Sequence, residues 1–411
     1  MNTTTAPLQT EQALPSGLPA AARTVLGLLQ RLRHGSLTLQ WPDGRVQHYG
    51  QPPAASGPTA VMHLHNWNVC AAAMKSGDIG FAESYIAGDW STPHLPDLLE
   101  LFIANRQTLE NVIYGHWAGR AWYRLRHLLH RNTRRNSRQN IHAHYDLGNR
   151  FYRLWLDETM NYSSAWFEGQ TDTPLPQAQS AKVRRALRMA GVQPGHRVLE
   201  IGCGWGALAE MASVEFEASL VGVTLSTEQL DFARQRMQRL GVAERVDLRL
   251  QDYRDIADGP YDAICSIEMV EAVGREYWPQ YFGRVARLLK PGGRACVQSI
   301  VIQDALFERY LRSTDFIQQY IFPGGCLPSP QAFQAEAEAA GLEVVDRFAF
   351  GADYAETCRR WRLAFMARQA EVLALGFDER FLRIWEFYLA YCEAGFARGD
   401  IDVMQFTLRK P

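Results

Sequence analysis

The sequence predicts an α/β protein in which a doubly wound, mostly parallel sheet follows a small N-terminal α+β domain. After residue 193, short apolar strand-like runs alternate with segments of helical spacing, which is the pattern of βα units. Before residue 115, the runs 36–41 and 45–49 flank the turn Pro42-Asp43-Gly44, as in a β-hairpin. A further strand-like run at 60–65 and a helical pattern at 95–109 complete this first domain.

The 411 residues are enough for two domains, and the chain divides into four predicted segments. Residues 1–20 are rich in Thr, Pro and Ala and have too little apolar content to pack, so we expect a disordered lead-in. Residues 21–115 form the N-terminal domain. Residues 116–140 form a basic linker, and residues 141–411 form the main domain.

The linker holds the most basic stretch of the chain, with arginines interleaved with aromatic residues and leucines. One interpretation is attraction to anionic lipid headgroups, at about 1 kcal/mol for each basic group near the surface. The other is a solvated connection, and the sequence leaves both open. The arginines are Arg124, Arg126, Arg131, Arg134, Arg135 and Arg138.

Composition excludes several classes of protein. The formal net charge of -1 argues against a generally basic nucleic-acid binder, so we expect no nucleic-acid partner. The seven cysteines are scattered singly, which predicts no metal site and fits a reducing cytoplasm. The N-terminus has no charged region followed by an apolar run, and no stretch approaches the about 18 apolar residues of a spanning helix. A cytoplasmic protein is therefore predicted.

The main domain is predicted from its alternating elements. The strands are expected at 197–202, 219–224, 246–250, 261–267 and 294–300, with helices at 207–214, 227–240 and 277–289. An interruption at 304–328 is followed by a helix at 330–340, a strand at 342–349, two long amphipathic helices and a closing strand at 401–408.

A glycine loop lies where the first of these strands turns into the first helix. The loop Gly202-Cys203-Gly204-Trp205-Gly206 follows Glu200 near the end of the strand. Glycines there let a ligand approach the backbone and the helix N-terminus. A dinucleotide fold would need a glycine at position 207 and an acid about 20 residues on, but residue 207 is alanine and the second strand ends at Thr224. We therefore expect a nucleotide-like cofactor; a purely structural turn is the alternative.

This acid-led loop resembles class I S-adenosylmethionine methyltransferases, and further segments resemble the cyclopropane fatty acid synthase family from about residue 30 to 408. The segments are His144-Tyr-Asp-Leu-Gly-Asn149, Asn161 to Phe167, Gly222 to Ser226, Gln251 to Arg254, Glu268 to Gly274, Tyr320 to Pro328 and Gly351 to Tyr354. The resemblance implies S-adenosylmethionine as cofactor, contacted by Tyr162, Ser163, Glu200, Gly202, Cys203, Gly204, Gly206, Thr224, Gln229, Asp252 and Tyr253.

The family holds a bicarbonate ion beside the transferred methyl group, using a cysteine, a glutamate, a histidine, an isoleucine backbone and a tyrosine. The resemblance implies that Glu271, Ile300 and Tyr354 fill three of these positions. Ser164 replaces the cysteine and Gln298 replaces the histidine. Serine and glutamine can still donate hydrogen bonds to an anion, so bicarbonate is retained as a candidate cofactor.

The resemblance also implies the reaction. A methyl(ene) carbon passes from S-adenosylmethionine to the cis double bond of unsaturated acyl chains in membrane phospholipids, which forms cyclopropane chains. Because relatives with similar substitutions look alike there, a methyl-branched or methylene product, or a furan fatty acid precursor, is the alternative. A non-catalytic lipid-binding module is a remote one. Lipid handling and homodimer contacts are implied for the N-terminal domain, with transient association at the inner face of the membrane.

The chemistry requires a dry pocket that presses a weakly nucleophilic alkene against a sulfonium methyl group. Aromatic faces can stabilise the carbocation that results, although such rings are also ordinary core residues. The candidates are Trp166, Phe167, Tyr320, Phe322 and Tyr354.

A base must then remove a proton. We assign Glu271 as its anchor, acting directly or through bicarbonate and Tyr354. The alternative is an acid that caps a helix start. Cys392 matches a C-terminal cysteine that the family has been held to need, and burial as a packing residue is its alternative.

Overall fold

The structure is a computed structural model that describes residues 15–50, 57–113 and 147–411. It divides into two compact units, Met1–Arg120 and Ala121–Pro411. Most of the predicted lead-in and all of the predicted linker 116–140 lie outside the described residues. No helix in the described ranges is long and apolar enough to cross a membrane.

The N-terminal unit contains a four-stranded sheet in the order β2-β1-β3-β4. β1 pairs antiparallel with β2, as the hairpin pattern predicts, and parallel with β3. The strands are β1 (Ser36–Gln40), β2 (Val46–Gly50), β3 (Thr59–Leu64) and β4 (Trp90–Ser91). The helices are α1 (Ala20–Leu29), α2 (Asn68–Ala87), α3 (Leu95–Ala104) and α4 (Arg106–Ile113).

The single helical pattern at 95–109 is divided at Asn105 into α3 and α4. The Asn105 side chain accepts hydrogen bonds from the backbone N–H groups of Arg33, at 2.8 Å, and His34, at 3.0 Å. The Asn105 amide also donates to the Leu101 carbonyl at 2.9 Å, a local side-chain bond of the kind that competes with the helix backbone, and this accounts for the break.

The main unit is built on a seven-stranded sheet, in the described residues, with the order β10-β11-β9-β8-β5-β6-β7. The five strands from β9 to β7 are parallel, and β11 runs antiparallel between β9 and β10. The strands are β5 (Arg197–Ile201), β6 (Ser219–Thr224), β7 (Val246–Leu250), β8 (Tyr261–Ile267), β9 (Leu289–Ile302), β10 (Glu343–Ala349) and β11 (Ile401–Arg409). The predicted doubly wound, mostly parallel sheet is confirmed.

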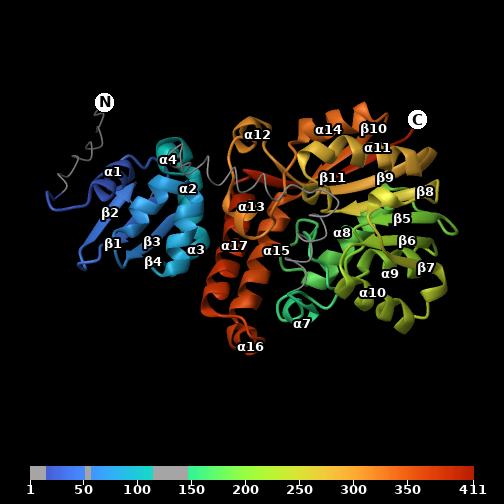
Figure 1. The fold of residues 1–411 in the computed structure, drawn as a ribbon, viewed down its shortest axis with the longest axis horizontal. Helices are drawn as coiled ribbons and strands as arrows, with labels where there is room; N and C mark the ends of the chain where they lie inside the picture. Colours follow the sequence, from blue (N-terminus) through green and yellow to red (C-terminus); the bar gives the residue numbers. More distant parts are fainter. Residues whose placement is uncertain (1–14, 51–56, 114–146) are drawn as a thin grey trace, which may run out of the picture. The chain divides into compact units, whose positions relative to one another are not determined.

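Helices cover both faces of this sheet (Figure 1). α8, α9 and α10 pack on one face, and α11 and α14 pack on the other. The helices of this unit are α7 (Asn149–Tyr152), α8 (Leu175–Met189), α9 (Ala207–Val214), α10 (Thr227–Arg239), α11 (Trp278–Leu288), α12 (Asp304–Tyr310), α13 (Phe316–Tyr320), α14 (Pro330–Ala339), α15 (Gly351–Met366), α16 (Gln369–Ala374) and α17 (Glu379–Ala397). Short 3-10 helices lie at Ala243–Arg245, Tyr253–Asp255, Val270–Ala272 and Arg275–Tyr277.

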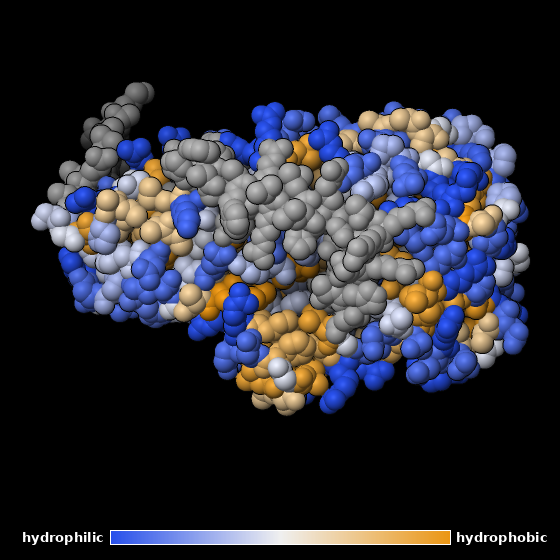
Figure 2. All heavy atoms as spheres, viewed as in Figure 1, coloured by the Kyte–Doolittle hydropathy of each residue, from blue (hydrophilic) through white to orange (hydrophobic). Residues whose placement is uncertain are grey.

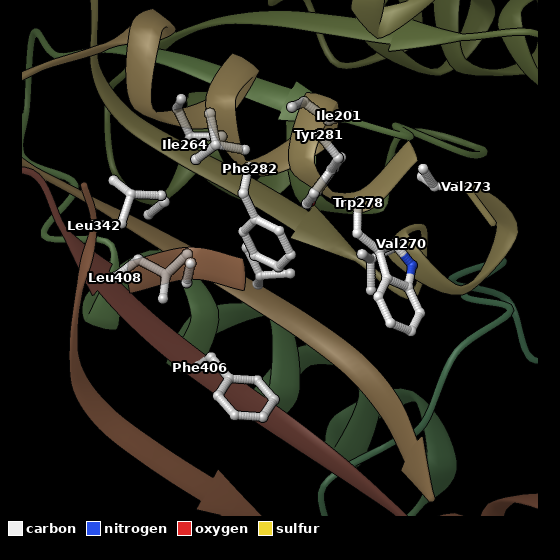
Figure 3. Close-up of a cluster of buried hydrophobic side chains, with 14 of the residues drawn as sticks. Ile201, Ile264, Val270, Val273, Trp278, Tyr281, Phe282, Leu342, Phe406 and Leu408 are labelled. Atoms are coloured by element: carbon white, nitrogen blue, oxygen red, sulfur yellow. The ribbon is translucent and has the colours of Figure 1, made fainter. Parts of the chain in front are cut away.

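A large hydrophobic cluster fixes α11 and α14 to the sheet. Figure 3 shows Trp278, Tyr281 and Phe282 lying over side chains from the strands. Phe406 of β11 is fully buried and stacks on Phe333 of α14, with ring centroids 3.8 Å apart. Burial of these rings removes a large apolar area from water and holds the sheet edge in register.

The order of the strands creates a switch point between β5 and β8. From β5 the chain builds outward through β6 and β7, and then returns to the other side of β5 to form β8 and β9. In open α/β sheets of this kind, ligands bind at the carboxyl ends of the strands beside such a point. The fold therefore directs attention to the residues that follow β5 and β8.

We expect Phe406→Ala to lower the free energy of unfolding by about 3–5 kcal/mol, because it removes a buried ring and leaves a cavity. Urea denaturation measures the change. Val345→Ala, on the neighbouring strand and 45% exposed, is the control and should alter stability by less than about 0.5 kcal/mol. A loss below about 1 kcal/mol for Phe406→Ala would contradict this account of the core.

Candidate active site

A pocket lies at the carboxyl ends of the parallel strands and takes in the switch point. It is lined by all but one of the residues predicted to contact the cofactor, and by Glu268, to which the sequence analysis gave no role. The exception, Gly206, directly precedes the first turn of α9. The predicted residues in the lining are Tyr162, Ser163, Glu200, Gly202, Cys203, Gly204, Thr224, Gln229, Asp252 and Tyr253.

The glycine loop is held close to the neighbouring strand. The backbone N–H groups of Gly202 and Cys203 both donate to the Val223 carbonyl, each at 3.0 Å. Gly202 has φ 87° and Gly204 has φ 49°, which are left-handed conformations that favour glycine. A Cβ atom at Gly202 would lie 3.0 Å from Cγ of Met269. The loop therefore needs glycine both for its backbone and for its close packing.

Glu200 places a carboxyl group in the wall of the pocket. Its side chain is buried on β5, and Oε2 has no hydrogen-bond partner among the described residues. Burial raises the pKa of this carboxyl to about 8, against the opposing charge of Lys182. An acceptor without a partner in a pocket suits a ligand that brings N–H or O–H donors. Glu200 therefore fits the amino group or hydroxyls of S-adenosylmethionine.

Two further polar contacts stiffen the far side of the pocket. The Thr224 hydroxyl donates to Oε1 of Gln229 at 2.9 Å, and both side chains are buried. Arg254 donates to both carboxylate oxygens of Asp252, at 2.9 and 2.6 Å. These bonds fix the side chains in one orientation before any ligand arrives.

The Glu268 carboxylate accepts hydrogen bonds from three of the residues that were expected to hold an anion. Its Oε1 accepts from the backbone N–H of Ser164, at 2.9 Å, and from Nε2 of Gln298, at 2.7 Å. Its Oε2 accepts from the Tyr354 hydroxyl at 2.6 Å. The main chain of Ser164 makes the contact, because its hydroxyl donates to the Ala165 carbonyl instead. The expectation that Ser164 helps to hold an anion stays a prediction.

The backbone of Glu268 is strained. Its φ is 50°, a left-handed value that costs a residue with a side chain about 1–2 kcal/mol. The strained turn is held because the Glu268 N–H donates to the Gln298 carbonyl at 2.8 Å. Strain of this kind persists where the surrounding structure enforces it, and it concentrates at functional sites.

Glu271 makes contacts that are separate from those of Glu268. Its Oε1 accepts from the backbone N–H of Ile300, and Oε2 has no partner in the described part of the chain. Burial, followed by the charge of Glu268, raises the pKa of the Glu271 carboxyl to about 8. The four donors expected to hold one bicarbonate ion are thus already shared between two carboxyl groups. The residues present do not fit a bicarbonate ion at this position.

Lys182, a fully buried lysine of α8, was not predicted from the sequence. Its Nζ donates to the Ser163 hydroxyl. Burial lowers the pKa of the ammonium group to about 8, and the charges of Glu268, Asp157 and Glu200 oppose that shift. Lys182 lies four residues after Ala178 and four before Ala186, on the buried face of an amphipathic helix. This spacing is the sequence signal that could have revealed the buried lysine.

A chain of amides runs from Glu268 toward the surface. Nε2 of Gln405 donates to Oε1 of Gln298 at 3.0 Å, and Arg185 donates to Oε1 of Gln405 at 2.6 Å. Because a guanidinium can only donate, this chain fixes which way both amides point. Gln298 therefore presents N–H, not carbonyl oxygen, to Glu268.

A row of aromatic rings connects Tyr162, in the pocket lining, with Tyr354, whose hydroxyl donates to Glu268. The ring of Tyr162, in the pocket lining, lies 5.5 Å from that of Trp361, which lies 6.0 Å from that of Tyr354. Tyr354 in turn stacks on Phe396, at 4.3 Å. None of the five predicted aromatic residues lines the described pocket, although Tyr354 contacts Glu268, which does.

The other four predicted rings pack elsewhere. Trp166 contacts Phe348, Phe167 lies in a small buried cluster, Tyr320 stacks on Phe316, and Phe322 contacts Tyr388.

Cys392 lies on α17, where burial raises the pKa of the thiol well above its ordinary value. The thiol is therefore uncharged near neutral pH, which does not suit a nucleophile. A direct role for Cys392 stays a prediction.

Comparison with known proteins identifies the family. The model of the family described as mycolic acid cyclopropane synthetase matches residues 132–406. The chain belongs to this family. The resemblance to cyclopropane fatty acid synthases seen in the sequence is thereby confirmed.

Two relatives match most of this chain. The tuberculostearic acid methyltransferase of Mycobacterium tuberculosis is 41% identical over 96% of this chain and 93% of its own. The cyclopropane-fatty-acyl-phospholipid synthase of Escherichia coli is 35% identical over 82% of this chain and 84% of its own.

Among solved structures, a mycolic acid cyclopropane synthase complexed with SAH and CTAB is 35% identical, with a TM-score of 0.62. The match covers 66% of this chain and 98% of that one. The fold is thus the class I methyltransferase fold, and the chain is an S-adenosylmethionine-dependent methyltransferase of the cyclopropane synthetase family.

We expect Gly202→Ala to weaken S-adenosylmethionine binding by at least about 10-fold, because the new methyl group meets Met269 and the left-handed backbone shifts. Isothermal titration calorimetry measures the affinity. Gly195→Ala is the matched control, since Gly195 has φ 78° but faces open space away from the pocket lining. Equal affinities for the two variants would contradict the assignment of the loop.

The raised pKa of Glu271 predicts a dependence of stability on pH. Because the folded protein binds this proton more tightly than the unfolded chain, the contribution is complete below about pH 4.5 and is lost as pH rises through about 8. Replacing Glu271 by Gln should therefore flatten the fall in the free energy of unfolding between those values. Chemical denaturation across this range measures it, and parallel profiles for the variant and the wild type would contradict the shift.

Proposed function

We propose that the protein transfers a methyl(ene) carbon from S-adenosylmethionine to the cis double bond of unsaturated acyl chains in membrane phospholipids. The observation that carries this proposal is a carboxylate, Glu268, in the wall of a pocket whose other walls suit the sulfonium donor. Alkylation of an alkene needs a proton acceptor beside the methyl group, whereas methylation of a thioether or similar nucleophile does not.

S-adenosylmethionine supplies an electrophilic methyl group when it is bound. Gly202 and Gly204 would let it approach the backbone, while Glu200, Gln229 and Asp252 would accept or donate hydrogen bonds to its polar groups. The rings of Tyr162, Trp361 and Tyr354 provide faces that stabilise positive charge on the alkylated chain. The geometry favours Glu268 over Glu271 as the group nearest this charge, because only Glu268 lines the pocket.

The first candidate product is a cyclopropane ring, as in the name of the Escherichia coli relative. A methylene chain, which a separate reduction would convert to a methyl branch, is the second candidate. The 41% identity to a tuberculostearic acid methyltransferase favours this second product. Both products arise from the same alkylated cation. Direct loss of a methyl proton closes the ring, whereas a methylene group forms when a hydride first shifts from the methyl-bearing carbon to the cationic carbon.

Contact with a lipid surface is supported by the hydrophobic surface at one end of the α15–α17 hairpin. Figure 2 shows hydrophobic residues gathered over α16 and the adjoining helix ends. Leu363 is 48% exposed there, and Ala367, Ala370 and Ala374 are exposed beside it. Exposed apolar patches commonly mark sites that contact membranes or partners. We propose transient association with the inner face of the cytoplasmic membrane, with lipid handling and homodimer contacts in residues 21–115.

The function is tested with purified protein, vesicles of monounsaturated phospholipid and methyl-labelled S-adenosylmethionine. Label should enter the acyl chains, and vesicles of fully saturated phospholipid are the control. Proton resonances of the isolated lipid distinguish a cyclopropane ring from a methylene group, which have equal mass. Equal labelling of both kinds of vesicle, or none of either, would contradict the proposal.

A further inference from the structure

The position of the Glu268 carboxylate carries an inference that rests on the proposed function and deepens it. We propose that Glu268 is a built-in proton acceptor, so that this enzyme needs no bicarbonate. Three observations support the proposal: the donors that surround this carboxylate, the strained backbone that presents it, and its place in the wall of the pocket.

The donors around Glu268 are already bound to its own carboxylate. Oε1 accepts two N–H groups and Oε2 accepts one O–H group, which is the coordination expected of a bound carboxylate ion. A free bicarbonate ion would have to displace the side chain and compete with a carboxylate that is covalently part of the protein. Tethering gives the resident carboxylate the advantage of a high effective concentration.

The directions of these hydrogen bonds indicate which oxygen receives the proton. The backbone N–H of Ser164 can only donate, and Gln405 holds Gln298 with its N–H toward Oε1. Oε1 therefore cannot carry a proton without facing another donor hydrogen. The partner of Oε2 is the Tyr354 hydroxyl, which can turn from donor to acceptor. Oε2 is accordingly the atom that takes the proton.

The step balances without another reactant. One alkene carbon bonds to the methyl carbon as the methyl–sulfur bond breaks, which leaves a cation on the other alkene carbon. Oε2 of Glu268 then accepts a proton from the new methyl group, and the electrons of that C–H bond close the ring. If a hydride first shifts from the methyl-bearing carbon to the cationic carbon, the positive charge moves next to the methyl group. Loss of a methyl proton to Oε2 then forms a methylene double bond. In both cases the proton leaves Glu268 for solvent before the next turnover.

The first experiment compares turnover of the full chain with and without bicarbonate, in buffers stripped of carbon dioxide. Monounsaturated phospholipid vesicles and methyl-labelled S-adenosylmethionine are the substrates. Wild-type turnover should change by less than about two-fold on adding bicarbonate, and Glu268→Gln should lower turnover by about 100-fold or more. Affinity for S-adenosylmethionine, measured by calorimetry, should stay within about three-fold of the wild type, because the glutamine preserves shape.

The second experiment replaces the carboxylate by a free anion. Glu268→Gly suits the left-handed backbone and opens the donors of Ser164, Gln298 and Tyr354. Formate should bind to this variant by calorimetry and restore part of its turnover. Glu217→Gly is the matched control, because Glu217 is an exposed glutamate with φ 52° outside the pocket lining. It should keep wild-type turnover and bind no formate.

The outcomes separate this inference from the proposed function. If bicarbonate raises wild-type turnover 10-fold or more, or if Glu268→Gln keeps near-normal turnover, the inference is overturned while the function stands. If no vesicle is labelled, the proposed function fails. Formate binding then still tests whether the Glu268 carboxylate occupies an anion-binding position. Formate bound by Glu268→Gly and not by the wild type supports that place; formate bound equally by both overturns it.

Discussion

The site depends on one constraint: ionisable side chains are buried beside the switch point, and their charges must compensate one another. Lys182 is fully buried, and its ammonium group is opposed in charge by Glu268, Asp157 and Glu200. A buried ion is tolerated only where opposite charges and hydrogen bonds compensate for lost hydration. The hydrophobic packing of α8 against β9 places the lysine, and the lysine in turn allows carboxylates to gather at the ends of β5 and β8. The charge of Lys182 therefore opposes part of the rise in pKa that burial causes at Glu200 and Glu268.

The same constraint explains why the carboxyl groups differ. Glu268 has three donors and a nearby cation, whereas Glu271 has one donor and a nearby anion. When two carboxyl groups are adjacent, the one with more hydrogen-bond donors ionises more readily. Its negative charge then raises the pKa of the other. Burial raises the pKa of Glu268 as well, but its three donors and the charge of Lys182 oppose that rise, so Glu268 is the more readily ionised member. Burial and the charge of Glu268 raise the pKa of Glu271 to about 8.

The fold was predictable because the spacing of apolar residues along the sequence reflects which side chains are buried. The alternation of apolar runs and helical spacing gave the parallel strands, and the glycine loop marked the carboxyl end of the first strand. The division at Asn105 was not predictable, since it depends on the backbone of a segment 71 residues away. Most of the residues predicted to contact the cofactor line the pocket, and these were named through the family resemblance. Glu268 and Lys182 were not, because their roles follow from hydrogen bonds between elements far apart in the sequence.

On the proposed role of Glu268, the site keeps its chemistry while the residues that perform it change. Residue-by-residue transfer from the family keeps Glu271, Ile300 and Tyr354 and then asks whether Ser164 and Gln298 tolerate the same anion. The geometry answers differently, since the substituted positions serve a carboxylate already present in the chain. A tethered carboxylate has one position, and a bound ion can adopt several. Product choice would then depend on how the acyl chain lies against a fixed Oε2, so that substitutions lining the chain's path, not the base itself, decide between ring and methylene.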